Sequence, residues 1–473
     1  MGSKKVLLVF PGEMFLPIAT RKWPLNESLL ALYSYLRAHG VDRVEVVDLT
    51  LEPIRFPTSA EDLPRFETDC EQILAALDFD VAAISSFSTY SFQSAMLLGR
   101  ICRRIRPDST IVVGGWHALT HASDFATAEG IFDLVVIGYG ERVLLSIARG
   151  EFSRNGGETR ILKAGGPLPG EHPWLDYAFA DYEVACRSRY GDRIASLESL
   201  TVSISRGCPY ECDFCANSQL DQRRWEVAKV EETIELLARA AGAFPRLRCI
   251  YFSEALFGMS KRWRREFLKR LPGGLPGMDF MLITRSDILD EEDVRLFRTN
   301  RVFVVLGMES LSTRMLEVMN KTRDPAGYIE RARALVADLG RHGVPHEVFL
   351  ILDHPGETVE TMDETLARAS EFLGEGSAVS AFRYIHLPQF ALRYPGYRER
   401  FRTEFRGRLD WWREPRSVDL RSIQDSYVPS KEEGESFEAA RERFAGKVRF
   451  LESSYARFER KKSVEDAIEE VHS

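Results

Sequence analysis

The sequence predicts an α/β protein with two parallel sheets and an α-rich C-terminal extension. Short apolar runs alternate with amphipathic helical stretches from residue 5 to residue 149, and the alternation returns between residues 199 and 385. Beyond Pro388 it stops. The first series predicts a Rossmann-like, flavodoxin-like doubly wound sheet, and the second a partial (βα)6 TIM-like barrel. The expected domains are residues 1–150, a linker over 151–195, the barrel over 196–387 and a capping extension over 388–473.

Composition limits the function classes. The 473 residues are 44% hydrophobic and 28% charged with a net charge of −8, so no electrostatic grip on nucleic acid is expected. No apolar run approaches the roughly 20 residues of a membrane span, and residues 1–9 lack the plan of a signal peptide. Seven cysteines, an odd number with three clustered, fit a reduced cytoplasmic setting better than a secreted disulfide protein.

In the first domain each predicted strand is an apolar run rich in branched residues, as a sheet covered on both faces requires. The helix after the first strand has apolar residues at i, i+3, i+4 and i+7 from Leu29 and stops at Gly40. Another helix is expected over 92–105, and Glu141 opens the last one. The expected strands are residues 6–10, 44–49, 81–86, 110–113 and 134–137.

The loops at the carboxyl ends of these strands are the candidate site of the first domain, because open α/β sheets bind ligands there. Glycines and small hydroxyls let the backbone approach a large flat ligand and donate N–H groups to it. For any single glycine, a turn with positive φ is the simpler explanation. The candidate residues are Pro11, Gly12, Ser86, Ser88, Thr89, Gly114, Gly115, Trp116, Gly138, Tyr139 and Gly140.

The linker is rich in glycine and proline and shows little periodicity, which predicts a connector between domains. Its aromatic residues are expected to pin it to a surface by core packing rather than to stack on a ligand. These are Trp174, Tyr177, Phe179 and Tyr182.

The barrel is predicted from six strand–helix repeats. Its functional groups are expected at the strand carboxyl ends. The expected strands are residues 201–205, 249–252, 280–283, 302–306, 347–352 and 381–385. The expected helices are residues 230–241, 261–270, 291–299, 312–318, 326–342 and 359–373.

A loop with three cysteines follows the first barrel strand. Cys208, Cys212 and Cys215 have the spacing C-x3-C-x2-C, and thiolate is the soft ligand that iron–sulfur clusters select. Three thiolates hold three irons of a four-iron cluster and leave one iron without a protein ligand. The alternative is zinc, which prefers four N/S ligands with paired C-x2-C spacing, and no second pair stands nearby.

This spacing, with an aromatic residue before the third cysteine, resembles the signature of radical S-adenosylmethionine (SAM) enzymes. With the order of the glycine loops, it makes residues 5 to about 385 similar to the subgroup that carries an N-terminal cobalamin-binding domain. The resemblance implies a [4Fe-4S] cluster on the three cysteines, SAM on the open iron and cobalamin at the glycine loops. The Asp-x-His-x-x-Gly motif of many cobalamin proteins is absent, so no axial ligand is assigned. Trp116 could cap the corrin or fill its pocket.

The resemblance also implies SAM contacts inside the cluster loop and at the ends of the next three strands. Relatives usually have two acids against the SAM amino group, so Ser253 is a departure. Arg285 would bind the SAM carboxylate and Glu309 the ribose hydroxyls, whereas a salt bridge of either residue to the other or to Asp287 is the alternative. The expected SAM residues are Phe214 (against adenine), Ser253, Glu254, Arg285 and Glu309.

Polar residues also follow the last two barrel strands. Asp353 and His354 stand where relatives usually have glycine and a small or apolar residue, so either could bind a polar substrate or move a proton. A local Asp–His pair that stiffens the loop is the alternative. Arg383, Tyr384 and His386 are expected to contact the substrate at the same rim.

The C-terminal extension is expected to cap the barrel mouth. Residues 390–416 are dense in aromatics and arginines, including Trp411 and Trp412, but their acidic neighbours weigh against a nucleic-acid stacking platform. A helix is expected over 430–461, with Phe437 and Phe444 on the stripe that packs on the barrel.

The resemblance implies an enzyme in which SAM is cleaved reductively to a 5′-deoxyadenosyl radical that abstracts a substrate hydrogen. Methylcobalamin would then supply a methyl group to an unactivated carbon of a polar small molecule, such as an antibiotic intermediate. A flavodoxin or ferredoxin is the expected electron donor. The second hypothesis is a radical SAM dehydratase or cyclase, for example on an amino sugar, which Trp116 and the pair Asp353–His354 favour. A non-catalytic iron–sulfur protein is the third.

Overall fold

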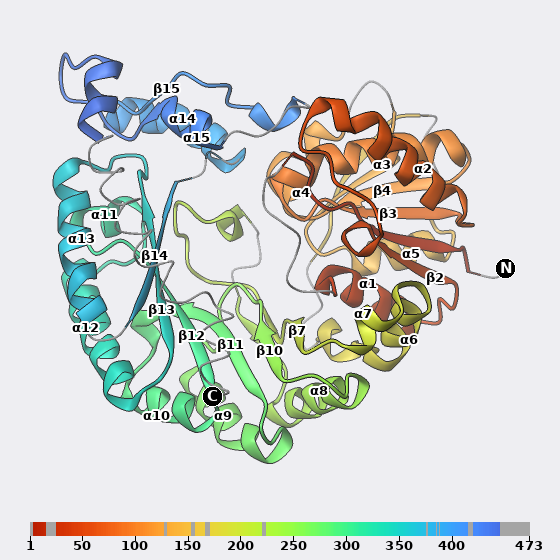
Figure 1. The fold of residues 1–473 in the computed structure, drawn as a ribbon, viewed down its shortest axis with the longest axis horizontal. Helices are drawn as coiled ribbons and strands as arrows, with labels where there is room; N and C mark the ends of the chain where they lie inside the picture. Colours follow the sequence, from red (N-terminus) through yellow and green to blue (C-terminus); the bar gives the residue numbers. More distant parts are fainter. Residues whose placement is uncertain are drawn as a thin grey trace.

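The computed structural model describes residues 3–15, 25–126, 130–152, 157–165, 171–219, 224–374, 377–384, 386, 388–414 and 420–444. In these ranges two six-stranded parallel sheets lie side by side, and a C-terminal segment runs across one end of both (Figure 1). The α/β fold predicted from the sequence is therefore confirmed.

The first sheet has the strand order β2-β1-β3-β4-β5-β6, so the order reverses between β1 and β3. Open sheets bind ligands at such a reversal, outside the strand carboxyl ends. The strands are β1 (Val6–Phe10), β2 (Val44–Asp48), β3 (Val81–Ser85), β4 (Thr110–Gly114), β5 (Leu134–Ile137) and β6 (Arg160–Lys163). The helices are α1 (Glu27–Ala38), α2 (Leu63–Ala75), α3 (Phe92–Ile105), α4 (Trp116–His121) and α5 (Glu141–Ala148).

Helix α1 begins where its sequence provides a cap. The Asn26 side-chain oxygen accepts hydrogen bonds from the backbone N–H groups of Ser28 at 2.9 Å and Leu29 at 3.3 Å, which satisfies N–H groups that have no partner within the helix. Leu29 and Leu36 are fully buried against the sheet. The cap thus fixes Glu27 as the first helical residue, at the carboxyl edge of the sheet.

Several elements were missing from the sequence prediction, among them the strand β6 and the helices α2, α4, α6 (Phe179–Tyr190) and α7 (Asp192–Ala195). β6 pairs in parallel with β5, so the first sheet extends beyond residue 150 into the stretch expected to be a connector. All four β6 residues are exposed, which is why the strand has no apolar alternation to detect. α2 buries Phe66, Cys70 and Leu74 on one face. The connector also contains α6 and the short α7.

The connector joins the two domains through a shared core, as its aromatic residues predict. Trp174, Tyr177, Phe179 and Tyr182 are at most 2% exposed. They belong to one apolar cluster that runs from the α1 and α5 side of the first sheet to the outer layer of the barrel. The two domains are therefore packed together along the connector.

The second sheet has the order β14-β13-β12-β11-β10-β7, with all strands parallel and the helices on its outer side (Figure 1). The strands are β7 (Ser199–Val202), β10 (Cys249–Phe252), β11 (Asp279–Arg285), β12 (Val302–Glu309), β13 (His346–Leu352) and β14 (Ala378–Arg383). The helices are α8 (Val230–Ala243), α9 (Lys261–Gly274), α10 (Glu291–Thr299), α11 (Thr313–Val318), α12 (Pro325–His342) and α13 (Val359–Gly374). The predicted six repeats are all present.

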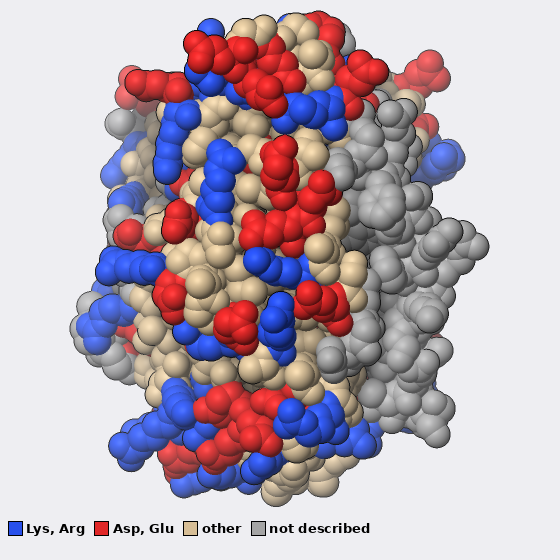
Figure 2. Space-filling model, turned by 90° about the vertical axis from the view of Figure 1, so that its left-hand side faces the viewer, with Lys and Arg blue, Asp and Glu red and all other residues tan. Residues whose placement is uncertain are grey.

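Basic and acidic side chains are interspersed on the side of the barrel seen in Figure 2. Some pair across neighbouring helices, as Arg333 of α12 does with Glu371 of α13 at 2.9 Å. Exposed pairs of this kind contribute at most about 1 kcal/mol each. No helix in the described ranges has both the length and the apolar character of a membrane span.

The C-terminal segment, residues 388–414 and 420–444, contacts the first domain as well as the barrel. Trp411 donates its indole N–H to the carbonyl of His386 at 2.7 Å, and its ring centroid lies 5.5 Å from that of Tyr90 of the first domain. Trp412 is buried in the core of that domain. The helix expected from residue 430 begins at residue 437, and residues 445–461 lie outside the described ranges. The elements are α14 (Pro388–Phe401), β15 (Glu404–Phe405), α15 (Leu420–Asp425) and β16 (Tyr427–Val428).

Candidate active site

The three-cysteine loop lies at the carboxyl end of β7. β8 (Ser205–Arg206) pairs with β9 (Glu226–Val227) and frames the loop. Within it, the N–H of Cys215 donates to the carbonyl of Cys212 at 3.2 Å, and the N–H of Asp213 donates to the carbonyl of Met319 at 2.8 Å. All seven cysteines of the chain are free thiols. The loop therefore presents three thiols on one folded turn.

Two buried cations stand beside the thiols. Arg285 donates Nη1 to the Sγ of Cys212 at 3.6 Å, and its guanidinium lies 3.7 Å from the centroid of the Tyr210 ring. Burial raises the pKa of the Cys212 thiol, and Lys321 and Arg285 oppose that rise. Three thiols backed by two cations fit an anionic iron–sulfur cluster.

In the described part of the chain, no three His, Cys, Asp or Glu side chains are arranged to hold a single metal ion. A four-iron cluster binds each thiolate through a different iron, so its sulfurs need not converge on one point. The cysteines thus keep their predicted assignment as cluster ligands.

Arg285 makes the salt bridge to Asp287 that was the predicted alternative to SAM binding, whereas Glu309 pairs with a residue outside the prediction, Lys321. Arg285 binds both oxygens of Asp287 at 2.8 Å, and Glu309 lies 3.1 Å from Lys321 Nζ. Lys321, which the sequence analysis missed, is 4% exposed and also donates to the carbonyl of Gly307 at 2.7 Å. Burial alone would lower the pKa of Lys321, but Glu309 raises it to about 12. Lys321 is therefore a permanent charge beside the cluster loop.

Glu254 is the predicted SAM residue that has a side-chain oxygen free to bind a ligand. It is 7% exposed at the end of β10, and its Oε2 has no hydrogen-bond partner among the described residues. Burial raises the pKa of Glu254 to about 8, and the nearby carboxylate of Glu27 adds to the rise. The Oε1 atom accepts from Ser205 at 3.5 Å, but a buried carboxylate oxygen without a partner is costly, so the site fits a cationic group such as the SAM ammonium.

Ser253 and Phe214 have protein partners. Ser253 donates its hydroxyl to Glu27 of α1, in the other domain. Phe214 packs against the aromatic cluster of the C-terminal segment, and Lys321 Nζ lies 5.9 Å from its ring. The predicted residues Cys212, Arg285 and Glu309 are therefore brought together around Phe214 and Lys321, and Ser253 faces the first domain.

In the first domain, the loops after β3 and β4 form a flat, partly apolar edge. Phe87 is 47% exposed and Trp116 is 36% exposed. Gly115 has φ +107, and a Cβ there would meet the carbonyl oxygen of Ser86 at 2.3 Å, so the two loops touch. Exposed rings beside close-packed backbone fit a flat ligand such as a corrin.

The other candidate loop residues differ in their burial and in their contacts. Pro11 and Gly12 are buried, and the ring of Phe56 covers Gly12, so packing explains this turn. Ser88 donates to Glu13, and Thr89 lies 3.4 Å from the imidazole of His117. Gly138, Tyr139 and Gly140 are half-buried and precede α5. Their role in binding cobalamin remains a prediction.

We expect Gly115→Ala to destabilise the first domain and weaken cobalamin binding. Positive φ costs an alanine about 1–2 kcal/mol, and the contact with Ser86 adds roughly 1–3 kcal/mol of overpacking. Gly150→Ala is the matched control, because Gly150 has φ +79 but nothing within 4 Å of its Cβ position. Thermal unfolding and cobalamin retention should both be affected more by Gly115→Ala, and equal effects would contradict the close contact.

The predicted catalytic pair lies under the C-terminal segment rather than at an open rim. Asp353 is 2% exposed and binds Arg383 Nε at 2.5 Å. His354 is fully buried, with its ring 5.1 Å from that of Tyr384, and burial lowers its pKa to about 4. His386 is 1% exposed among Phe390, Phe405 and Tyr427. Contact with substrate by these residues stays a prediction that requires the segment to move.

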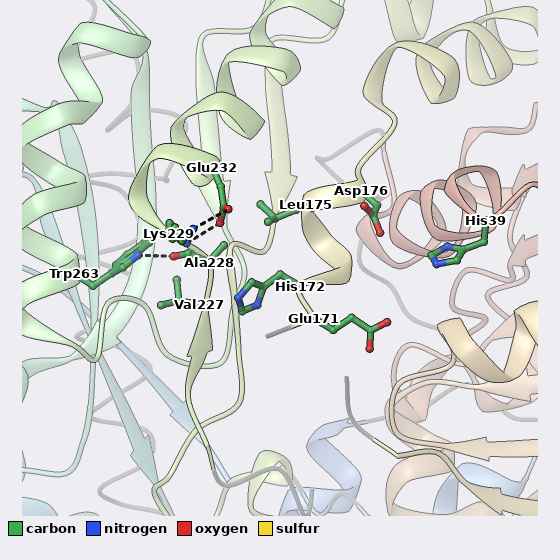
Figure 3. Close-up of a pocket in the computed structure, with 10 residues that line it drawn as sticks. All are labelled: His39, Glu171, His172, Leu175, Asp176, Val227, Ala228, Lys229, Glu232 and Trp263. Atoms are coloured by element: carbon green, nitrogen blue, oxygen red, sulfur yellow. Dashed lines mark hydrogen bonds and ion pairs between the residues drawn. The ribbon is translucent and has the colours of Figure 1, made fainter. Parts of the chain in front are cut away.

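A pocket of about 760 Å³ opens where the connector meets both domains (Figure 3). Acidic and basic side chains surround it, and Lys229 is paired with Glu232. None of the predicted site residues lines it. Its lining residues are His39, Glu171, His172, Leu175, Asp176, Val227, Ala228, Lys229, Glu232 and Trp263.

Comparisons with known proteins agree with this division of the chain. Residues 202–369 match the radical SAM superfamily, and residues 28–148 match the B12 binding domain. The chain is 25% identical over 368 residues to the anaerobic magnesium-protoporphyrin IX monomethyl ester cyclase of Rubrivivax gelatinosus, which covers 72% of this chain and 61% of the relative. It is 23% identical over 387 residues to an uncharacterized methyltransferase of Pyrococcus horikoshii, covering 78% and 79%.

Among solved structures, the chain is similar to the radical SAM methyltransferase TsrM from Kitasatospora setae, whose structure has cobalamin and a [4Fe-4S] cluster bound. The TM-score is 0.61 at 19% identity, covering 84% of this chain and 76% of that one. At this identity the likeness shows the fold alone. The chain spans less than two thirds of the cyclase named above.

Proposed function

Because the chain belongs to the B12-binding radical SAM enzymes, we propose that it methylates an unactivated carbon of a polar small molecule. The observation that carries the proposal is the arrangement of the two halves. The B12 binding domain and the radical SAM barrel are joined through residues at their strand carboxyl ends, as the contact of Glu27 with Ser253 illustrates. The candidate sites of the two cofactors therefore share one interface.

When bound, the cluster and SAM supply a carbon radical and cobalamin supplies a transferable methyl group. Cys208, Cys212 and Cys215 would hold the cluster, and Arg285 and Lys321 would balance its charge. Glu254 would accept the SAM ammonium. The C-terminal segment would exclude water from the barrel mouth, where Tyr384 and Phe390 are buried.

The test is anaerobic purification with cobalamin supplied, followed by addition of SAM and a strong reductant. The proposal predicts bound corrin, 5′-deoxyadenosine and S-adenosylhomocysteine among the products. Protein that contains zinc in place of iron, or that leaves SAM intact, would contradict it. We also propose that a flavodoxin or ferredoxin is the electron donor in a reducing cytoplasm, which the seven free thiols suit.

Glu254 gives SAM binding a characteristic pH dependence. Its pKa of about 8 lies above the ordinary carboxyl value, so at neutral pH the empty protein holds it protonated, whereas a bound ammonium requires the carboxylate. SAM affinity should therefore rise between about pH 6 and pH 7.5, by up to roughly tenfold per unit. Glu254→Gln should bind SAM more weakly and without this slope.

Isothermal titration with SAM at several pH values measures the effect. Glu347→Gln is the matched control, because burial also raises the pKa of Glu347 but this residue lies at the opposite end of the sheet, in β13. An unchanged slope in Glu254→Gln would show that Glu254 does not bind the ammonium.

A second candidate function is oxidative cyclisation or dehydration on the same scaffold, with an adenosyl radical and without methyl transfer. The name of the Rubrivivax gelatinosus relative, a cyclase, favours it, as does the exposed Trp116. This alternative predicts 5′-deoxyadenosine without S-adenosylhomocysteine.

A further inference from the structure

Two polar contacts join the first domain to the barrel at the edge where both sheets end. Arg206, two positions before Cys208, donates Nη2 to Glu141, and Ser253 donates its hydroxyl to Glu27. Glu141 and Glu27 are the first residues of α5 and α1. Each contact thus links a loop of the candidate cobalamin site to a residue beside the candidate cluster or SAM site.

The Arg206 contact is buried, and the planar guanidinium lies against two aromatic rings. The side chains of Arg206 and Glu141 are 10% and 6% exposed, and the guanidinium lies 4.3 Å from the ring centroid of Tyr139 and 5.4 Å from that of Trp174. Burial alone would lower the pKa of Arg206, but Glu141 raises it above its ordinary value. Removing one partner of such a pair leaves a buried charge, so the contact holds the two loops in one relative position.

The Glu27 contact stands on a different helix and a different strand. Glu27 also accepts a hydrogen bond from the Tyr177 hydroxyl at 3.1 Å, and the Ser253 hydroxyl lies 3.2 Å from that of Ser203. The amino end of α1 favours a carboxylate at this position. The apolar core along the connector already packs the two domains together, and these two polar contacts on separate elements add restraints at the edge where the candidate cofactor sites lie.

We propose that Arg206 and Glu27 are positioning residues that fix the separation of the two cofactor sites across the domain interface. The inference rests on the proposed function. Transfer between two bound partners is sensitive to distance, and a misplacement of about 1 Å can cost on the order of a hundredfold in rate. Loosening the Arg206 contact should therefore impair reactions that need both halves of the protein and spare those confined to the barrel. Loosening the Glu27 contact also changes the surroundings of Ser253 and Glu254, so its effect is measured by the distance between the cofactors alone.

The test uses the full chain loaded with cluster and cobalamin and compares Glu141→Gln and Glu27→Gln with the wild type. Glu183→Gln is the matched control, because Glu183 is 7% exposed and paired with Arg187, but within α6. Pulsed electron paramagnetic resonance measures the magnetic coupling between the reduced cluster and bound Co(II) cobalamin. We expect one narrow distance distribution in the wild type and in Glu183→Gln, and broader distributions in the two interface variants.

A second measurement compares a reaction that needs both domains with a reaction confined to the barrel. At saturating SAM, the formation of S-adenosylhomocysteine should fall on the order of a hundredfold in Glu141→Gln, while 5′-deoxyadenosine formation changes by less than about threefold. Unchanged coupling in both variants and unchanged S-adenosylhomocysteine in Glu141→Gln would overturn the positioning role. A wild type that lacks the cluster or cobalamin signal would instead contradict the proposed function.

Discussion

Cys212→Ala is expected to abolish iron binding and SAM cleavage. Cys212 is one of only three thiols on the cluster loop and receives the hydrogen bond from Arg285 at 3.6 Å. With one ligand lost, two irons of the cluster would lack a protein thiolate. The loop should keep its conformation, because the hydrogen bond from the Cys215 N–H to the carbonyl of residue 212 does not involve the sulfur. Iron per chain should fall from about four to near zero, and 5′-deoxyadenosine should become undetectable.

Iron analysis and the sulfur-to-iron charge-transfer absorbance measure this result on protein prepared without oxygen. Cys186→Ala is the matched control, because Cys186 is also a buried free thiol, 2% exposed, but lies in α6. The control should keep its iron. A Cys212→Ala protein that retains a full cluster would show that the ligands lie elsewhere.

The fold could be predicted from the sequence where packing against both faces of a sheet imposes a pattern. β1 and α10 begin and end at the predicted residues because their boundaries coincide with a turn or a cap, such as Asp290 before α10. The edge strand β6 could not be found, because its four exposed residues have no packing partner to select apolar side chains. Burial was not sufficient, however, because α2 was missed although it buries Phe66, Cys70 and Leu74.

The candidate site shows the same limit across the domain interface. The predicted cluster cysteines are local in sequence, so their spacing alone is enough to predict them as ligands. The contacts of Glu27 with Ser253 and of Arg206 with Glu141 join residues 226 and 65 positions apart. They depend on how two separate sheets meet, which no local pattern encodes. Lys321 was missed for a different reason: its partners Gly307 and Glu309 lie nearby on β12 of the same domain, but no motif marks a lone lysine in the loop after α11.

Asp124 is the buried carboxylate among the contacts that hold the C-terminal segment to the first domain, alongside Gln93, which donates to the carbonyl of Trp412 at 2.9 Å, and the burial of Trp412. Asp124 accepts hydrogen bonds from Trp412 at 2.7 Å and Arg413 at 2.6 Å and lies 3.0 Å from the imidazole of His117. Burial alone would raise the pKa of Asp124, but these contacts lower it below its ordinary value. Its contribution to stability is therefore present above the ordinary carboxyl pKa and is lost as the pH falls through the lowered one.

Asp124→Ala should destabilise the protein by about 1–3 kcal/mol, because it leaves the buried indole N–H of Trp412 without its partner, whereas Arg413 is 49% exposed and stays solvated. Thermal unfolding near neutral pH, with limited proteolysis of residues 402–414, measures the loss. Asp410→Ala is the matched control in the same segment, since its pair with Arg408 is exposed and worth at most about 1 kcal/mol. Equal losses in the two variants would mean that the segment is held elsewhere, and Asp124 would then not be what seals the barrel mouth against the first domain.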